Sequence, residues 1–288
     1  MRTLRLQYPI PLMSRMLDVS ISGYYAWQDR PLSQHDREEL RLELEIKAAD
    51  RRTKQSYGAE RLQHDLEDHG IRVGVCRIKR LRAKLGIRCK QKRKFKATTY
   101  SKHGLPVAEN LLNQQFQAIA PNKVWLSDIT YVPTDEGWLY MAGHKDLFTH
   151  EIVGYSLGER MTKDLVRESL LRAVEAKRPP RGLMHHSDRG SQYCSYEYRQ
   201  LLDYFEMKAS MSGKGNCYDN APMESFWGML KQELMIYNSH FETRQEAKQT
   251  ITEYIEIFYN RQRLQANLGF ISPVAYAQKY YAGLLVAA

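Results

Sequence analysis

The sequence has few cysteines and none in a metal-binding arrangement. Its 288 residues include only four, which lie far apart: Cys76, Cys89, Cys194 and Cys217. No Cys-x-x-Cys pair occurs, so the pattern argues against a zinc knuckle and against a thiol redox motif. Scattered, unpaired cysteines are typical of a reducing compartment, and we therefore expect a cytoplasmic protein.

Long apolar runs are also missing. No stretch reaches the roughly 18 apolar residues that a membrane-spanning helix needs. The opening segment, MRTLRLQYPIPLM, lacks the apolar centre of a signal peptide. We find no internal repeat, and no sustained heptad pattern at the start of the chain. These absences favour a protein that neither enters a membrane nor opens with a long coiled coil.

Acidic residues are scarce in one part of a chain whose formal net charge is +10. Residues 51–105 hold 17 Lys and Arg but 4 Asp and Glu, whereas the remainder of the chain holds 26 and 29. One segment therefore supplies the whole positive excess. Such a concentration is typical of a nucleic-acid-binding module; the alternative is a solvated helical face.

From residue 121 onwards the sequence carries an α/β pattern. Three runs rich in β-branched and aromatic residues predict three strands between residues 124 and 161. The following segments alternate between helical and strand-like patterns: helix 162–177, strand 182–186, helix 195–207, strand 208–212 and helix 221–234. The order β-β-β-α-β-α-β-α predicts a mixed five-stranded sheet with flanking helices.

Three acidic residues occupy defined places in this pattern. Asp128 lies in the first predicted strand, Asp188 just after the fourth, and Glu224 in the last helix, with 35 residues between Asp188 and Glu224. Magnesium prefers oxygen ligands and keeps several waters, so a few carboxylates suffice to hold it. Two such ions can drive in-line attack on a phosphodiester. The alternative is three surface carboxylates, and Asp146 and Asp219 are the competing acids.

Seven segments carry a family resemblance. They are SGYYAW (22–27), SYGAERL (56–62), PNKVWLSDITYVPTDEGWLYMA (121–142), DLFTHEIVGYS (146–156), HHSDRGSQYCS (185–195), SMSGKGNCYDNAPMESFWGMLKQEL (210–234) and YIEIFYNRQR (254–263). On these segments the chain resembles the second-reading-frame (OrfB) transposases of the bacterial insertion-sequence-three family. Residues 121–235 resemble the ribonuclease-H-like catalytic core of DDE transposases and retroviral integrases. The resemblance covers nearly the whole chain.

The resemblance implies a function and its partners. It implies that Asp128, Asp188 and Glu224 form the DDE triad, with two Mg²⁺ or Mn²⁺ ions per active site. The activity implied is DNA strand cleavage and 3′-end joining at insertion-sequence ends. Double-stranded DNA, as terminal inverted repeats and as target, would be the partner of a homo-oligomer associated with the bacterial nucleoid. An upstream OrfA-type protein or fusion is also implied, whereas the His–His–Cys–Cys zinc module of retroviral integrases has no counterpart here.

Two departures from the family pattern stand out. Lys145 precedes Asp146, where the family usually has an apolar residue. Near the C-terminus, a basic and polar trio of the family is replaced by Leu264, Gln265 and Ala266. The second departure bears on the contacts that the C-terminal segment makes, and neither touches the triad.

The patterns divide the chain into five parts. They are an N-terminal helical hairpin (1–34), a helix-turn-helix-like DNA-binding module (35–89), a basic linker (90–118), the ribonuclease-H-like core (119–235) and a helical C-terminal segment (236–288). Within the module, Gly70 and Gly86 are expected to end helices. The fold class is thus an α/β core with all-α segments on either side.

The module and the linker contain two groups of candidate DNA-binding residues. Arg77, Lys79 and Arg80 lie on a predicted helix that resembles the major-groove helix of a helix-turn-helix. The linker begins with KQKRKFK, and its candidates are Lys92, Arg93 and Lys94. Linker lysines and arginines would suit phosphate contacts, which give affinity but little sequence information.

Further candidates surround the three acids. Lys231 comes seven residues after the glutamate, hence nearly above it on one helix face; the alternative is a solvent-facing lysine. His186 and Arg189 flank the second aspartate, although His186 also fits a structural histidine. Lys214 and Asn216 belong to a polar loop that would follow DNA or serve as a connector.

Two other functions compete with transposition. One is a DNA-binding regulator, or partner subunit, whose core no longer cuts. The other is a structure-specific nuclease on the same fold. Metal-dependent 3′-end joining on oligonucleotides separates the three, because a regulator performs neither step and a nuclease cuts without joining.

Overall fold

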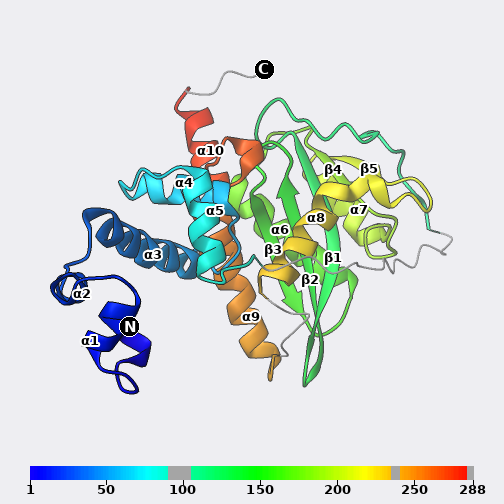
Figure 1. The fold of residues 1–288 in the computed structure, drawn as a ribbon. Helices are drawn as coiled ribbons and strands as arrows, with labels where there is room; N and C mark the ends of the chain where they lie inside the picture. Colours follow the sequence, from blue (N-terminus) through cyan, green and yellow to red (C-terminus); the bar gives the residue numbers. More distant parts are fainter. Residues whose placement is uncertain (90–104, 235–240, 284–288) are drawn as a thin grey trace.

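The computed structural model describes residues 1–89, 105–234 and 241–283. Its centre is a five-stranded mixed sheet in which strands and helices follow the predicted order (Figure 1). The strands are β1 (Val124–Thr134), β2 (Gly137–Asp146), β3 (Ile152–Gly158), β4 (Met184–Ser187) and β5 (Lys208–Met211). The core helices are α6 (Lys163–Lys177), α7 (Tyr196–Tyr204) and α8 (Ala221–Glu233). The predicted fold class is confirmed.

The sheet has the spatial order β3-β2-β1-β4-β5. The first three strands form an antiparallel meander, whereas β4 and β5 join parallel to β1. Parallel pairing needs a crossover connection, and α6 and α7 supply the two crossovers. In the parallel pair β1–β4, Ser127 lies opposite Ser187. This register fixes how the residues directly after these two serines lie relative to each other.

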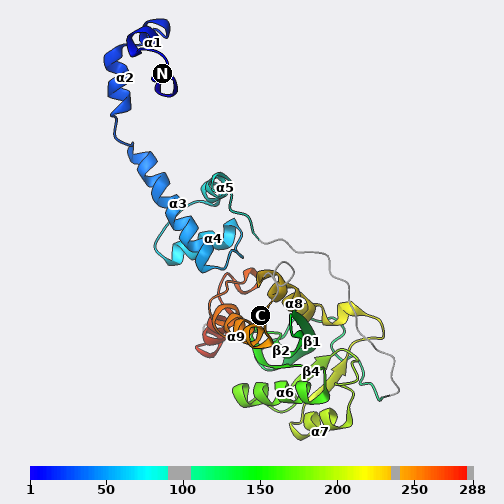
Figure 2. The ribbon, with the colours of Figure 1, turned by 90° about the horizontal axis from the view of Figure 1, so that it is seen from below.

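Alternating side chains of β1 face two different helical layers. Leu126 and Val132 pack in one apolar cluster with Phe226 of α8. Trp125, on the opposite face, packs in a second cluster with Val166 of α6 and other residues of α6 and α7. Successive side chains of a strand point to opposite faces, so Asp128 shares the α8 face with Leu126. Figure 2 shows the sheet between α8 on one side and α6 and α7 on the other.

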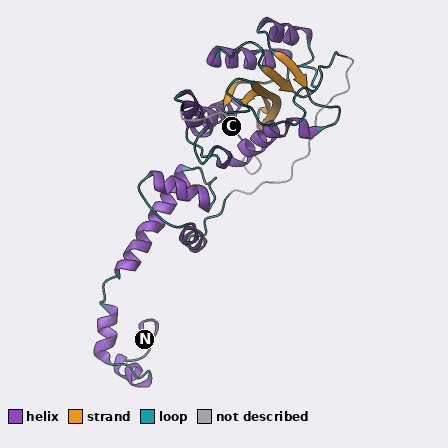
Figure 3. Cartoon of the chain, turned by 90° about the horizontal axis from the view of Figure 1, so that it is seen from above, coloured by secondary structure: helices purple, strands orange, loops and turns teal. Residues whose placement is uncertain are grey.

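The N-terminal part is all helical. Its helices are α1 (Ile10–Met16), α2 (Ile21–Gln28), α3 (Gln34–Arg52), α4 (Ala59–Asp68) and α5 (Val75–Lys84), after a short turn η1 (Arg2–Leu4). Figures 2 and 3 both place α1 and α2 at the far end of α3, away from the sheet. The expected stops lie just past α4 and α5, where Gly70 and Gly86 adopt φ of 78° and 68°. Glycine adopts this left-handed conformation without steric cost.

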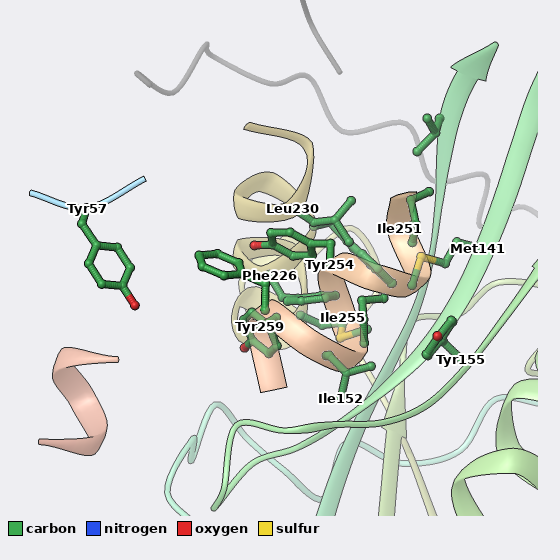
Figure 4. Packing of buried hydrophobic residues seen from close by; sticks show 14 of the residues in the cluster. Tyr57, Met141, Ile152, Tyr155, Phe226, Leu230, Ile251, Tyr254, Ile255 and Tyr259 are labelled. Carbon is green, nitrogen blue, oxygen red and sulfur yellow. The ribbon is translucent and has the colours of Figure 1, made fainter. Parts of the chain in front are cut away.

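The C-terminal part packs on the α8 side of the sheet. It consists of α9 (Arg244–Glu253), the π-helical segment η3 (Tyr254–Tyr259), the turn η4 (Ala266–Leu268) and α10 (Pro273–Tyr281). Tyr254 and Tyr259 of η3 are buried against Phe226 and Leu230 of α8 (Figure 4). No helix among the described residues is long and apolar enough to cross a membrane.

Close packing between β3 and α6 depends on a glycine. A Cβ built on Gly154 would lie 2.5 Å from both the Cβ and the backbone nitrogen of Ala173. Such overlap forces the strand and the helix apart. We therefore expect Gly154→Ala to destabilise the protein by roughly 1–3 kcal/mol, measured by urea denaturation. Gly228→Ala is the matched control, because nothing lies within 4 Å of its added Cβ in α8, and it should raise stability by roughly 0.5–1 kcal/mol.

Candidate active site

Two of the predicted acids are brought together by the register of β1 and β4. Ser127 pairs with Ser187 in this parallel ladder, so the next residue on each strand, Asp128 and Asp188, lie side by side. Asp128 is still within β1, whereas Asp188 follows the last residue of β4. Both side chains are half-buried. The arrangement follows from the register of the parallel pair, since the residues that come after a matched pair on two parallel strands continue in the same direction.

Asp128 is oriented by a tryptophan of α8. Trp227 Nε1 donates a hydrogen bond of 3.1 Å to Asp128 Oδ2. Gly143 lies opposite Asp128 on β2, and a Cβ there would come within 3.0 Å of the Trp227 ring. The missing side chain therefore leaves room for the indole that reaches Asp128. Sequence reasoning did not foresee this contact, because nothing in the local pattern pairs the two residues.

Asp188 is oriented by the turn that follows it. The backbone N–H of Gly190 donates to Asp188 Oδ1 at 2.9 Å. A Cβ on Gly190 would lie 3.0 Å from that same oxygen, so a glycine is needed for this close approach. Arg189, between them, donates from Nε to the carbonyl of Ser212 at 2.6 Å, which ties the turn to the end of β5. Arg189 thus has a structural contact at the position predicted to bind DNA.

Glu224 enters from α8, in the first turn of that helix. A carboxylate is favourable there because the helix dipole is positive at its N-terminus. The start of α8 is fixed to β1, since Asn220 Nδ2 donates to the carbonyl of Ser127 at 3.0 Å. Lys145, the departure from the family pattern, is buried and donates to the carbonyl of Pro222 at 3.3 Å. Burial lowers the pKa of Lys145 to about 8, and the nearby charge of Arg263 acts in the same direction.

The three carboxyl groups influence one another. Burial, followed by the neighbouring charge of Asp188, raises the pKa of Asp128 well above its usual range, and Glu224 adds to this effect. Burial and Asp188 also raise the pKa of Glu224. Both burial and like charges favour the neutral form of a carboxyl group, so a cation at the site would favour ionisation of all three. Among the described residues, no three His, Cys, Asp or Glu side chains converge closely enough to enclose a metal ion.

Lys231 is buried, with 4% of its surface exposed, which rules out the solvent-facing alternative. Its Nζ lies 5.0 Å from the centre of the Tyr131 ring, as in a cation–π contact. Burial lowers the pKa of Lys231 to about 8, although the charge of Asp128 opposes this shift. Lys231 is therefore a buried side chain that packs on Tyr131 and lies close enough to Asp128 to be influenced by its charge.

His186 is fully buried on β4. Its Nδ1 lies 2.9 Å from Ser210 Oγ, and its Nε2 lies 3.3 Å from Ser212 Oγ. Burial lowers the pKa of His186 to about 4, although the charge of Asp219 opposes this shift. With both ring nitrogens occupied inside the protein, His186 fits the structural alternative rather than a contact with DNA.

The two competing acids are occupied elsewhere. Asp146 is buried and accepts backbone hydrogen bonds from three residues, at 2.6, 2.9 and 2.7 Å: Asn122, Phe148 and Thr149. Asp219 orders the polar loop before α8, accepting from Gly213 N at 2.6 Å and from Asn216 Nδ2 at 2.7 Å. Burial acts to raise the pKa of Asp219, but the hydrogen bonds from Gly213 and Gln114 and the nearby charges of His186 and Arg189 lower it. Lys214, at the tip of the same loop, is exposed.

The basic helix α5 lies against acidic side chains of α3. Arg77 Nη1 lies 3.2 Å from Glu38 Oε1, and Arg80 forms an ion pair with Glu39. Lys79 is exposed on another face of α5. Two of the three predicted base-reading residues therefore have intramolecular carboxylate partners. The linker candidates Lys92, Arg93 and Lys94 lie outside the described residues.

Comparisons with known proteins cover most of the chain. Residues 118–217 and residues 224–280 match integrase core domain families. Residues 35–95 match an HTH-like domain family. Two solved structures have a related shape. One is a simian T-cell lymphotropic virus intasome in complex with the PP2A regulatory subunit B56 gamma, with 17% identity, a TM-score of 0.48, and coverage of 75% of this chain and 70% of that chain. The other is the HTLV-2 integrase catalytic core domain in complex with magnesium, with 17% identity, a TM-score of 0.44, and coverage of 56% of this chain and 99% of that chain.

Two relatives extend along nearly the full length. The insertion element IS600 uncharacterized 31 kDa protein of Shigella sonnei is 57% identical over 269 residues, which are 93% of this chain and 98% of that protein. Transposase InsF for insertion sequence IS3A of Escherichia coli (strain K12) is 41% identical over 275 residues, which are 95% of both chains. The chain therefore belongs to the family of IS3-type transposases, DNA-cutting and DNA-joining enzymes with an integrase core and an HTH-like domain.

Proposed function

We propose that this transposase cleaves DNA strands at the ends of its insertion sequence and joins the 3′ ends to target DNA, using Asp128, Asp188 and Glu224. One observation carries the assignment. The parallel register of β1 and β4 sets Asp128 beside Asp188, and α8 packs on the same face with Glu224 in its first turn. Unrelated surface carboxylates would have no reason to combine this strand register, a shared α8 face and the hydrogen bond from Trp227 to Asp128.

The three carboxylates fit Mg²⁺ or Mn²⁺, with two ions per active site in our proposal. Hard oxygen ligands suit these ions. Burial, followed by the neighbouring charges of Asp188 and Glu224, raises the pKa of Asp128, and a bound cation would offset both effects. When bound, such a pair would activate the attacking oxygen and stabilise the leaving one. The protein residues supply orientation: Trp227 holds Asp128, and Gly190 holds Asp188.

DNA is the proposed partner of the module as well as of the core. The HTH-like match over residues 35–95 and the concentration of positive charge in residues 51–105 support binding of terminal inverted repeats. We further propose that the five parts predicted from the sequence are the functional units of the chain. The protein would act as a homo-oligomer on DNA, with an upstream OrfA-type protein or fusion as its partner.

Two alternatives make different predictions. A DNA-binding regulator would bind terminal repeats without cutting them, and a nuclease would cut without joining. The shared placement of three acids disfavours the regulator, which has no need for a crowded, destabilising carboxylate site. The long match to IS3-type transposases disfavours a general nuclease.

Replacing any one of the three acids by its neutral amide should abolish DNA cleavage and joining. We expect Asp128→Asn, Asp188→Asn and Glu224→Gln each to reduce cleavage and joining of terminal-repeat oligonucleotides by on the order of 10³-fold or more, because a held metal ion supplies several kcal/mol. Asp203→Asn, at an exposed aspartate of α7, is the control outside the triad and should leave both steps unchanged. Circular dichroism checks the fold, and a chelator should reproduce the loss in the unmodified protein. Cleavage retained by one variant would remove that residue from the site.

The crowded site also predicts a pH-dependent cost in stability. A carboxyl whose pKa is raised by folding stabilises the folded state below its unfolded pKa, and this contribution is lost as the pH rises through the folded pKa. The metal-free protein should therefore lose stability, relative to Asp128→Asn, from about pH 4 towards neutral pH. Near neutral pH the variant should therefore be the more stable of the two proteins in urea denaturation.

Two controls accompany this stability measurement. Asp203→Asn, at an exposed aspartate of α7, should change stability little. Millimolar magnesium should stabilise the unmodified protein but not Asp128→Asn, because a ligand that binds only the folded state raises its stability. Equal stabilities of both proteins at neutral pH, with and without magnesium, would argue against a metal site at Asp128.

The basic module should bind DNA in a strongly salt-dependent manner. We expect Lys79→Ala to weaken binding of the terminal-repeat duplex by roughly 1–3 kcal/mol and to relax preference for the repeat. Glu39→Gln should act in the opposite direction, because it releases Arg80 from its ion pair. Titrations of terminal-repeat and scrambled duplexes at several salt concentrations measure both effects. An equal loss on both duplexes would mean that Lys79 contacts phosphate only.

A further inference from the structure

The C-terminal end of α8 is held by a buried ion pair. Glu233, the last residue of α8, accepts from Arg263 through both oxygens: Nε lies at 3.1 and 3.0 Å, and Nη2 lies 2.7 Å from Oε1. Only 5% and 6% of the two side chains are exposed. Tyr254 adds a hydrogen bond of 2.8 Å to the other carboxylate oxygen. A carboxylate at a helix C-terminus opposes the helix dipole, so this end of α8 requires its cation.

The backbone around Arg263 also contacts the HTH-like module. The N–H of Leu264 donates to the hydroxyl of Tyr57 at 2.6 Å, and that hydroxyl lies 3.4 Å from the carbonyl of Gln262. Tyr57 is buried just before α4 and belongs to the same apolar cluster as Leu230 of α8 (Figure 4). One tyrosine of the module therefore engages the residues on both sides of the arginine that fixes α8.

Other contacts extend this junction along the C-terminal segment. Lys54 Nζ lies 2.9 Å from Glu253 Oε1 and 5.8 Å from the centre of the Phe258 ring. The ring of His64 stacks on that of Phe270 at 4.0 Å. The C-terminal segment thus contacts the module at several points between Glu253 and Phe270, and Leu264 contributes its backbone N–H.

We infer that Arg263 and Tyr57 are positioning residues that link the DNA-binding module to the helix carrying Glu224 and Lys231. The inference rests on the proposed function of the three acids. Glu233 and Glu224 lie nine residues apart on one helix, roughly 13 Å, and a helix moves as a stiff rod. A shift at its C-terminal end therefore moves Glu224, and a displacement of about 1 Å at a reacting centre can cost on the order of 10²-fold in rate.

Changes at Arg263 and at Tyr57 should affect cleavage differently. Arg263 sets the position of α8 whatever DNA is bound, so Arg263→Lys, which keeps the charge but loses the two-pronged contact, should slow all cleavage. Tyr57 relates that position to the module, so Tyr57→Phe should slow only cleavage stimulated by the terminal repeat. Neither change removes a residue of the proposed DNA-binding face, so affinity for the repeat should be unchanged.

Single-turnover cleavage of terminal-repeat and scrambled duplexes, with magnesium, tests this assignment. We expect Arg263→Lys to lower both rates by about tenfold or more, and Tyr57→Phe to lower the ratio of the two rates. Tyr259→Phe is the matched control, because it removes a hydroxyl from a hydrogen bond to the carbonyl of His150 without touching the module. It should leave the ratio unchanged. An unaltered ratio in Tyr57→Phe, or a normal rate in Arg263→Lys, would overturn the inference.

Amide hydrogen exchange tests the link without any reaction. Tyr57→Phe should speed exchange at Leu264 and in the last turn of α8, whereas Tyr259→Phe should leave that turn unchanged. Equal protection there in the unmodified protein and in Tyr57→Phe would overturn the link, even if Arg263→Lys proved unable to fold. Absence of metal-dependent cleavage by the unmodified protein would instead contradict the proposed function, and the exchange measurement would still decide the link.

Discussion

The parallel pairing of β1 with β4 is the constraint on which the site depends. It sets Asp128 beside Asp188 through the register of Ser127 and Ser187, although burial and, after it, the charge of Asp188 disfavour the ionised form of Asp128 and raise its pKa. The opposing stabilisation comes from apolar clusters on both faces of the sheet. A rigid sheet can hold like charges together because slipping the register by one residue would turn every buried side chain of β1 to the other face.

The third acid is placed by a helix instead, and a helix needs fixing at both ends. At the start of α8, Asn220 and Lys145 attach the first turn to the sheet. At its other end, Arg263 holds Glu233. Between them, Trp227 binds Asp128 from the helix side. The position of Glu224 relative to the two aspartates therefore depends on four separate contacts between α8 and other parts of the chain.

The strand and helix pattern, the place of the three acids and the stops at Gly70 and Gly86 were predictable, because each depends on local periodicity or backbone conformation. The burial of Lys231 was not. Its sequence spacing from Glu224 indicates a shared helix face, but only the packing of β1 decides that this face is covered. The contact between Trp227 and Asp128 joins residues 99 positions apart, and no local pattern encodes a pairing over such a distance.

The net charge counted along the sequence also overestimates the positive charge that the folded module presents to DNA. Part of the positive charge in residues 51–105 lies on α5, where Arg77 and Arg80 pair with Glu38 and Glu39 of α3. Ion pairs at a surface contribute little to stability, so phosphates could replace the two glutamates as partners of these arginines. In the DNA-binding role that we propose for the module, the α3 carboxylates would weaken indiscriminate attraction to DNA, because a duplex would have to offer α5 better contacts than α3 does.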